Sequence, residues 1–159
     1  MLLAVDTSNR WIGIALYDGE QVKGEMVWNT KNHHTVELAP ALEQLYTRCD
    51  VSNADLKALA IATGPGSFTS LRIGMSVVKG MALALHLPVI GVPSLDVLAA
   101  AQPVNDLPLA AVLKAGRGRL AMVWYKLYRN RWKADSQPKV VTTTALADLL
   151  NEPTTVCGE

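Results

Sequence analysis

Three short runs with the periodicity of β-strands occupy the first 29 residues, and this pattern limits the fold more than any other feature of the chain. Residues 1–5 (MLLAV) and 11–17 (WIGIALY) are continuous apolar runs, which is typical of strands buried on both faces. Asp18-Gly19 is a hairpin signal, and residues 22–28 after it alternate between apolar and polar side chains. The sequence therefore predicts an antiparallel meander of three strands.

Helical periodicity replaces the strand pattern from residue 35. Apolar side chains recur every three or four residues from Thr35 to Cys49, which predicts a helix with Pro40 at a kink or in its first turn. Four further elements are predicted, namely a strand over 56–63, a long helix over 68–86, a strand over 88–92 and a helix over 95–101 capped by Ser94. The order β-β-β-α-β-α-β-α predicts an α/β domain with helices on both faces of a mixed sheet.

Residues 102–108 (QPVNDLP) have the composition of a linker, so a domain boundary is expected after residue 104. The patterns beyond it predict strands over 109–113 and 120–128, a short helix over 146–150 and the beginning of a strand at 155–157. Two strands and one helix do not close a sheet. We therefore expect a first domain over 1–104 and an incomplete second domain over 105–159.

Composition is typical of a globular cytoplasmic protein. Hydrophobic residues make up 50% of the chain and charged residues 18%, which is enough apolar material for a core and excludes disorder. The apolar runs are far shorter than the roughly 20 residues of a membrane-spanning helix. No basic segment precedes Asp6, so no signal peptide is expected, and Cys49 and Cys157 fit neither a metal site nor a disulfide framework.

The second half of the chain contains a basic stretch. Between Asp106 and Asp135 there is no acidic residue, and seven basic ones occur, namely Lys114, Arg117, Arg119, Lys126, Arg129, Arg131 and Lys133. Such a stretch could bind phosphate groups, because contacts to a nucleic-acid backbone require only positioned Lys and Arg side chains. A solvated pair of strands with a basic loop explains the same residues. The sequence leaves both interpretations open.

Two loops are candidates for phosphate binding. Residues 63–74 (TGPGSFTSLRIG) lie between a predicted strand and a predicted helix, where backbone N–H groups and the helix dipole favour an anion. A tight turn that lets the helix approach the sheet explains the glycines equally well, and no Walker sequence follows. Asp6, Thr7 and Ser8 follow the first strand and could face a nucleotide phosphate or its magnesium. A structural Asp capping the turn fits the same spacing.

The helix predicted over 68–86 is apolar nearly all round, which is typical of a helix buried on two sides. Its second side could pack against another protein, with Gly74 and Gly80 allowing close approach of a partner helix. Complete burial within this chain is the alternative. The residues that we assign to a partner interface are Leu71, Arg72, Met75, Val78 and Lys79 from this helix, with Leu38 and Leu42 from the preceding helix.

No catalytic residue and no metal site is predicted. His33, His34 and Glu37 lack the spacing of metal ligands, and a solvated helix start explains them better. Residues 66–70 (GSFTS) lack the second glycine of a nucleophile elbow. We therefore expect neither hydrolytic metal chemistry nor a serine nucleophile.

Several motifs occur together in the order found in one protein family. They are Asp6-Thr7-Ser8, His34-Thr35 with Leu38 and Pro40, GPGSFTSLRIG over 64–74, the helix end over 79–83 (KGMAL) and PVIGVPSLDVLA over 88–99. Together they resemble the TsaB family, also called YeaZ or glycoprotease-like, and the resemblance covers essentially the whole chain. It implies an actin/Hsp70/sugar-kinase-like (ribonuclease H-like) fold with two related domains.

The resemblance also implies a function. Members of this family are noncatalytic scaffold subunits in the synthesis of threonylcarbamoyladenosine in tRNA, where they bind and support the catalytic paralogue TsaD, assisted by the ATPase TsaE. For this chain it implies a cytoplasmic protein that forms a homodimer when alone, meets tRNA only indirectly through the complex and does not bind membranes. No cofactor is expected, and ATP and magnesium would bind only weakly or at an interface with a partner.

Departures from the family pattern affect these expectations. Ser70 replaces a usual glycine, Lys114 stands where the family has an aspartate, and Leu120 stands where a glutamate is expected. Lys114 removes a magnesium ligand from the cleft that the resemblance implies between the Asp6 loop and the second domain, and it could instead pair with Asp6. An ATP-binding or hydrolysing enzyme, a glycoprotease-like peptidase and a protein that binds tRNA directly are the alternative functions.

Overall fold

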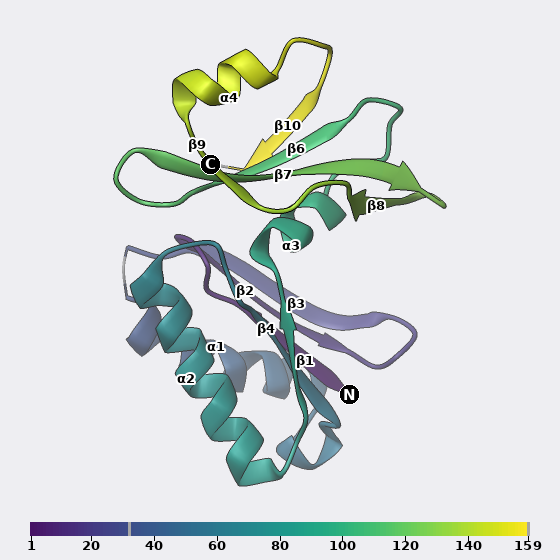
Figure 1. Cartoon of the computed structure of the whole chain (residues 1–159). Helices are drawn as coiled ribbons and strands as arrows, with labels where there is room; N and C mark the ends of the chain where they lie inside the picture. Colours follow the sequence, from purple (N-terminus) through teal and green to yellow (C-terminus); the bar gives the residue numbers. More distant parts are fainter. Residues whose placement is uncertain (32, 159) are drawn as a thin grey trace. The chain divides into compact units, whose positions relative to one another are not determined.

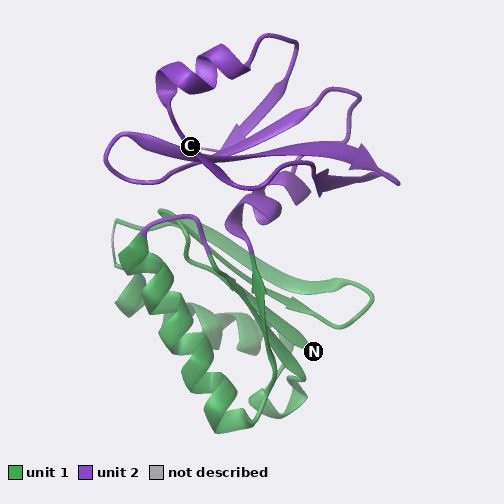
Figure 2. Cartoon of the chain, in the orientation of Figure 1, with its two compact units in different colours: residues 1–63, 68–92 green, residues 64–67, 93–159 purple. Residues whose placement is uncertain are grey.

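The computed structural model describes residues 1–31 and 33–158, which form two compact units (Figure 2). Unit 1 contains Met1–Thr63 and Phe68–Val92, and unit 2 contains Gly64–Ser67 and Pro93–Glu159. The boundary predicted after residue 104 is thus corrected to residue 92. The reason is that the helix α3 (Ser94–Ala100) buries Leu95 and Ala99 in the core of unit 2.

Unit 1 is built on one mixed five-stranded sheet, and the predicted order of elements is confirmed (Figure 1). Its elements are β1 (Leu2–Asp6), β2 (Trp11–Tyr17), β3 (Val22–Asn29), α1 (His34–Cys49), a 3-10 turn (Asn53–Asp55), β4 (Ala58–Ala62), α2 (Phe68–Leu85) and β5 (Val89–Val92). The strand order is β3-β2-β1-β4-β5, with β1, β2 and β3 antiparallel and β1, β4 and β5 parallel. After the N-terminal meander, the chain makes two crossover connections: α1 joins β3 to β4, and α2 joins β4 to β5.

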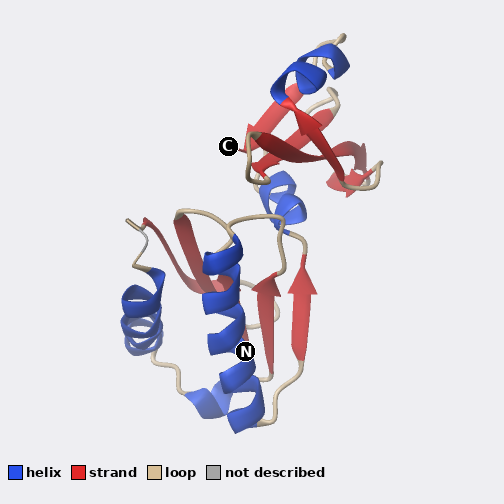
Figure 3. Ribbon diagram, turned by 60° about the vertical axis from the view of Figure 1, so that its left-hand side comes forward, coloured by secondary structure: helices blue, strands red, loops and turns tan. Residues whose placement is uncertain are grey.

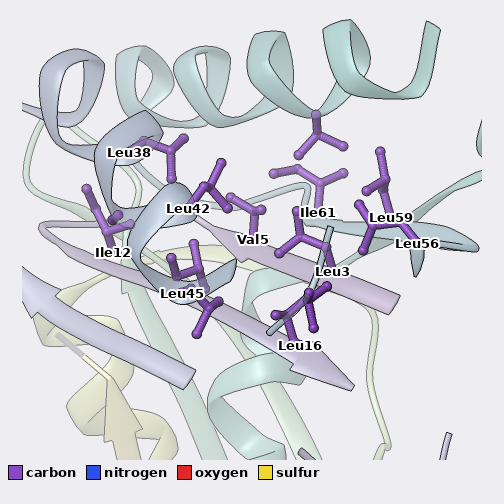
Figure 4. Packing of buried hydrophobic residues seen from close by; sticks show 14 residues of the cluster. Leu3, Val5, Ile12, Leu16, Leu38, Leu42, Leu45, Leu56, Leu59 and Ile61 are labelled. Carbon is purple, nitrogen blue, oxygen red and sulfur yellow. The ribbon is translucent and has the colours of Figure 1, made fainter. Parts of the chain in front are cut away.

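Both helices of unit 1 pack on the same face of this sheet. Figure 4 shows side chains of α1 directed at those of the strands, and Val78 of α2 joins the same core. The buried members include Leu3, Val5, Ile12, Ile14, Leu16, Leu38, Leu42, Leu45, Leu59 and Ile61. The alternation of the strands sends these residues to one face. The prediction of helices on both faces of the sheet therefore does not hold for unit 1.

Unit 2 has helices on opposite faces of a five-stranded sheet (Figures 1 and 3). Its strands are β6 (Leu109–Lys114), β7 (Arg119–Tyr128), β8 (Arg131–Ala134), β9 (Lys139–Thr142) and β10 (Thr155–Gly158), and its helices are α3 and α4 (Thr143–Leu149). One core contains Leu95 with Leu109 and Tyr125, and the other contains Met122 with Leu146 of α4. The prediction of helices on both faces is confirmed here.

The strand expected to begin at 155–157 is confirmed as β10, but two strands of this sheet, β8 and β9, were not predicted. The β7–β8 turn contains no glycine, yet Arg129 and Asn130 both have positive φ values of 48° and 61°. Asn tolerates this conformation, and two such residues form a tight hairpin turn. The turn therefore lacks the Gly signal that marks the hairpin at Asp18-Gly19.

One close approach positions α2 on the sheet. A Cβ atom placed on Gly74 would lie 2.3 Å from Oγ1 of Thr7, so only glycine lets the helix reach the β1–β2 loop. The Thr7 hydroxyl donates a hydrogen bond of 2.8 Å to the carbonyl oxygen of Ser70. Thr7 is fully buried at this contact. Gly74 therefore serves the packing of α2 within unit 1 and not the approach of a partner helix.

Gly74→Ala should lower the free energy of unfolding by about 1–3 kcal/mol, because the new methyl group overpacks a rigid contact. The loss should be smaller in a Thr7→Ala background, where the colliding Oγ1 atom is gone. Gly80→Ala is the matched control, since its Cβ would meet nothing within 4 Å, and it should raise stability by up to about 1 kcal/mol. Urea denaturation followed by circular dichroism measures all three. Equal effects at the two glycines would contradict this explanation.

Candidate partner-binding surface

Helix α2 is apolar but mostly exposed. Its mean hydropathy is 1.3, and only 17% of it is buried. By length and composition alone it could cross a membrane, but its Gly74 side is docked on Thr7 and its Val78 lies in the core. The largest side chains on the open side are Phe68 and Leu83, which are 73% and 77% exposed. Exposed apolar side chains of this size are typical of interaction sites when they share one surface.

Two hollows lie between the exposed sides of α1 and α2. The first, of about 470 Å³, is bordered by Thr35 of α1 and by Phe68, Arg72 and Val77 of α2, among others. The second, of about 810 Å³, is lined by Ala39, Leu42, Glu43, Tyr46, Thr47, Asp50, Val51, Ser52, Asn53, Asp55, Val77 and Met81. Val77 borders both, so the hollows follow one another along the helix pair. We call this region, with Phe68 and Leu83, the α1/α2 surface.

The structure separates the predicted interface residues into two groups. Leu38, Leu42 and Val78 are buried in the core of unit 1, so their assignment to a partner contact is corrected. They occupy the helix faces that point at the sheet, and helical spacing alone does not tell which apolar face is turned inward. Arg72 and Lys79 are exposed, and Leu71 and Met75 are half-buried, so their role in a partner contact stays a prediction.

Phe68 and Leu83 were missed as candidates for this surface. The guanidinium carbon of Arg72 lies 5.3 Å from the centre of the Phe68 ring, a cation–π contact on the exposed side of the helix. A side chain at Gly80 would meet nothing within 4 Å, and the approach of a partner helix at this residue stays a prediction. Phe68 is the first residue of α2, directly after the polar loop, and it lies outside the apolar spacing of the buried side. That position was the sequence signal that could have identified it as exposed.

An acidic rim borders the second hollow. Glu43, Asp50 and Asp55 are exposed carboxylates along it, and none of its lining residues is basic. The Asp55 carboxylate accepts hydrogen bonds from the hydroxyl and the backbone N–H of Ser52, which lowers the pKa of Asp55 and keeps it charged. The hollow therefore combines an apolar floor with a negatively charged edge.

Tyr46 lines this hollow, but its hydroxyl is buried beneath the surface. Within residues 1–31 and 33–158, its hydroxyl is the buried side-chain oxygen that has no hydrogen-bond partner, and burial raises the pKa of Tyr46. Leaving such a group unpaired costs free energy.

The start of α1 is held by a cluster of polar contacts. His34 is buried, and its Nε2 lies 3.1 Å from the carbonyl oxygen of Asn9, which accepts the ring N–H. The Glu37 carboxylate accepts a 2.9 Å hydrogen bond from Nε1 of Trp28, and its other oxygen lies 3.8 Å from His33 Nδ1. The Trp28 hydrogen bond is the main reason why the pKa of Glu37 is lowered. His34 and Glu37 therefore have structural roles.

The predicted phosphate loop is used for packing and for turn formation. The Thr7 hydroxyl is bonded to Ser70, and Ser8 is buried. The Asp6 carboxylate accepts a 2.7 Å hydrogen bond from the backbone N–H of Ser8, which fits the alternative of a structural Asp that caps the turn. Lys114 is exposed at the end of β6 in unit 2. Its pairing with Asp6 stays a prediction.

The glycine-rich loop is tied to α3 within unit 2. The Gly64 N–H donates to the Ser94 hydroxyl over 3.1 Å, and the Ser94 N–H donates to the Gly64 carbonyl over 2.9 Å. The prediction that Ser94 caps this helix is wrong, because Ser94 is the first residue of α3. These bonds support the interpretation of the loop as a packed turn. In the described part of the chain, no three His, Cys, Asp or Glu side chains cluster as metal ligands would.

Comparison with known proteins gives consistent matches. Residues 24–156 match a family model described as TsaD, tRNA N6-adenosine threonylcarbamoyltransferase. The chain is 37% identical over 129 residues to the tRNA threonylcarbamoyladenosine biosynthesis protein TsaB of Bacillus subtilis, covering 81% of this chain and 56% of that protein. It is 36% identical over 98 residues to TsaB of Escherichia coli, covering 62% and 42%. The chain thus spans about half the length of these relatives.

A solved structure supports the same relationship. YeaZ from Pseudomonas aeruginosa matches with a TM-score of 0.80 and 29% identity, covering 88% of this chain and 66% of that chain. This match and the observed order of elements confirm the predicted actin/sugar-kinase-like fold class.

Glu37→Gln should reduce the pH dependence of stability. The pKa of Glu37 is lower in the folded chain than its ordinary value of 4.5, so its charge stabilises the fold above that pH, and the stabilisation is lost as the pH falls through the folded value. The variant should therefore lose stability at neutral pH and lose less at about pH 3. Urea midpoints at both pH values measure this. Glu43→Gln, at an exposed site on the same helix, is the control, and identical behaviour of the two variants would refute the role of Glu37.

Proposed function

The chain belongs to the TsaB/YeaZ family, and from this premise we propose that it is a noncatalytic scaffold subunit in the synthesis of threonylcarbamoyladenosine in tRNA. Its partner in this role is the catalytic TsaD-like paralogue, which it binds through the α1/α2 surface of unit 1. The observation that carries the proposal is the exposed apolar side of α2 with Phe68 and Leu83 at its two ends.

The α1/α2 surface has the properties of a helix-binding groove. A partner helix laid along it would cover Phe68 and Leu83, and burying each of these side chains contributes about 1.5–3 kcal/mol. Gly80 is exposed on α2, and the open space there allows a partner backbone to approach this helix closely. Apolar anchors in hollows surrounded by polar residues are the usual arrangement of binding hot spots.

Charge and polarity further define the partner helix. The acidic rim of Glu43, Asp50 and Asp55 favours basic residues on the part of the partner that enters the second hollow. A partner with an apolar stripe and a basic edge meets both requirements.

The remaining parts of the proposal follow from the same role. The chain performs no chemistry itself, because Asp6, Thr7 and Ser8 are used within unit 1 and Lys114 replaces a carboxylate. A TsaE-like ATPase supplies nucleotide hydrolysis to the complex. When the catalytic paralogue is absent, a second copy of this chain covers the α1/α2 surface as a homodimer. The complex works in the cytoplasm.

Phe68→Glu and Leu83→Glu should each weaken binding to the catalytic paralogue of the same organism. The substitution leaves a charge unpaired in the interface, so we expect the Kd to rise more than tenfold, which is about 1.4 kcal/mol. Isothermal titration with the purified paralogue measures the change. Folding should be unaffected, because both side chains are mostly exposed.

Val27→Glu is the matched control, because Val27 is 65% exposed on β3 and lies outside the α1/α2 surface. It should leave the Kd unchanged. Equal binding by all three variants would place the interface elsewhere. Val78→Glu is unsuitable for this test, because Val78 is a core residue and the buried charge would unfold unit 1.

Titration of the chain with ATP and magnesium should show no binding tighter than about millimolar, or roughly 4 kcal/mol. The Thr7 hydroxyl is buried and donates to the Ser70 carbonyl, so it does not face a ligand, and a lysine at residue 114 would repel magnesium. Micromolar binding that requires magnesium and is abolished by Asp6→Ala would favour the alternative function of an ATP-dependent enzyme.

A further inference from the structure

The hairpin of β7 and β8 collects basic side chains on one of its faces. Lys126 pairs with Lys133 across the two strands, and Tyr128 pairs with Arg131 in the next row. Because side chains alternate along a strand, these four residues share one face. On the opposite face, Tyr125 and Trp132 pack in the core with α3.

The cross-strand pair of Lys126 and Lys133 is electrostatically unfavourable, because like charges lie directly opposite each other. One carboxylate lies near, since Asp135 forms a 2.8 Å ion pair with Lys126. Arg129, Arg131 and Lys133 take part in no ion pair within the described ranges 1–31 and 33–158. All three are exposed, so the hairpin carries three uncompensated positive charges close together.

Tyr128 holds two of these charges in place. The Arg129 guanidinium carbon lies 5.3 Å and the Lys133 ammonium nitrogen 5.1 Å from the centre of its ring. Cation–π attraction offsets part of the repulsion between the two cations and limits their motion. The tight turn at Arg129 and Asn130 sets the direction of the hairpin tip. The result is a preorganised set of cations on a rigid strand pair.

We propose that the face of Lys126, Tyr128, Arg129, Arg131 and Lys133, here called the hairpin face, binds the phosphate backbone of RNA. This inference goes beyond the scaffold role, because that role needs contact with tRNA only through the partner. Arg131 and Lys133 are alternate residues of one strand, so their side chains are spaced by roughly 6.7 Å. A phosphate backbone presents a continuous row of negative charges, which several cations on one exposed face can contact together.

Exposed Lys and Arg side chains that neutralise phosphates make binding strongly dependent on salt. The test uses the full chain without partner and a fluorescein-labelled tRNA transcript, with anisotropy measured between about 50 and 200 mM KCl. The variant Arg129→Asn/Arg131→Gln/Lys133→Gln should bind at least about tenfold more weakly at the low salt concentration. The slope of log K against log salt should also decrease by about 2, since three phosphate contacts are lost.

The matched control removes three cations from the hairpin of β6 and β7, at its turn. Lys114→Gln/Arg117→Asn/Arg119→Gln changes the net charge by the same amount and leaves the hairpin face intact. It should bind RNA almost as the parent chain does. If both triple variants weaken binding equally, only net charge matters, and the proposal is overturned.

Tyr128 provides a second, independent arm of the test. Tyr128→Phe keeps the ring and should keep RNA binding, whereas Tyr128→Leu removes the ring beneath Arg129 and Lys133 and should weaken it severalfold. Polyglutamate of equal charge should compete poorly with RNA. Effective competition by polyglutamate would indicate an acidic protein surface as the ligand and would contradict the proposal of RNA binding. Binding of the paralogue by the same variants is unaffected in either case, which keeps this test separate from that of the scaffold role.

Discussion

The contact between Gly74 and Thr7 is the constraint on which the rest of unit 1 depends. A side chain at residue 74 would collide with the Thr7 hydroxyl, which itself binds the carbonyl of Ser70. This contact sets the rotation of α2 about its own axis. With Val78 turned into the core, the side with Phe68 and Leu83 must face outward. The same packing that completes the core therefore creates the apolar surface to which we assign partner binding.

In each unit, the residues that form the hydrophobic core differ from those to which we assign ligand binding. In unit 2 the sheet is covered by α3 on one face and by α4 on the other, and the recognition elements are charged side chains on a hairpin that extends from the core. In unit 1 the recognition element is apolar and lies on helices. Apolar surfaces contribute most when water is fully excluded, whereas cations act over longer distances and depend on salt. The proposed ligands, a protein helix and an RNA backbone, match these two physical characters.

The sites that resemble nucleotide-binding loops have been turned into structural contacts. Asp6 closes the turn after β1, Thr7 docks α2, and Ser94 is bonded to Gly64 of the glycine-rich loop. The Thr7 hydroxyl has its proton committed to Ser70, whereas the Asp6 carboxylate keeps its second oxygen. Residue 114, where the family resemblance leads one to expect an aspartate, is a lysine. These contacts support the scaffold role that we propose.

The sequence by itself determined the order of elements in unit 1, because hydrophobic periodicity depends only on which face of a strand or helix is buried. It also determined the family, through motifs such as GPGSFTSLRIG. Only the tertiary structure decided which apolar side of α2 is open, because Val78 and Leu83 look equally apolar in the sequence but differ in what packs against them. The same holds for the hairpin face, where the register of β7 and β8 places Lys126 opposite Lys133, a pairing that no local pattern specifies.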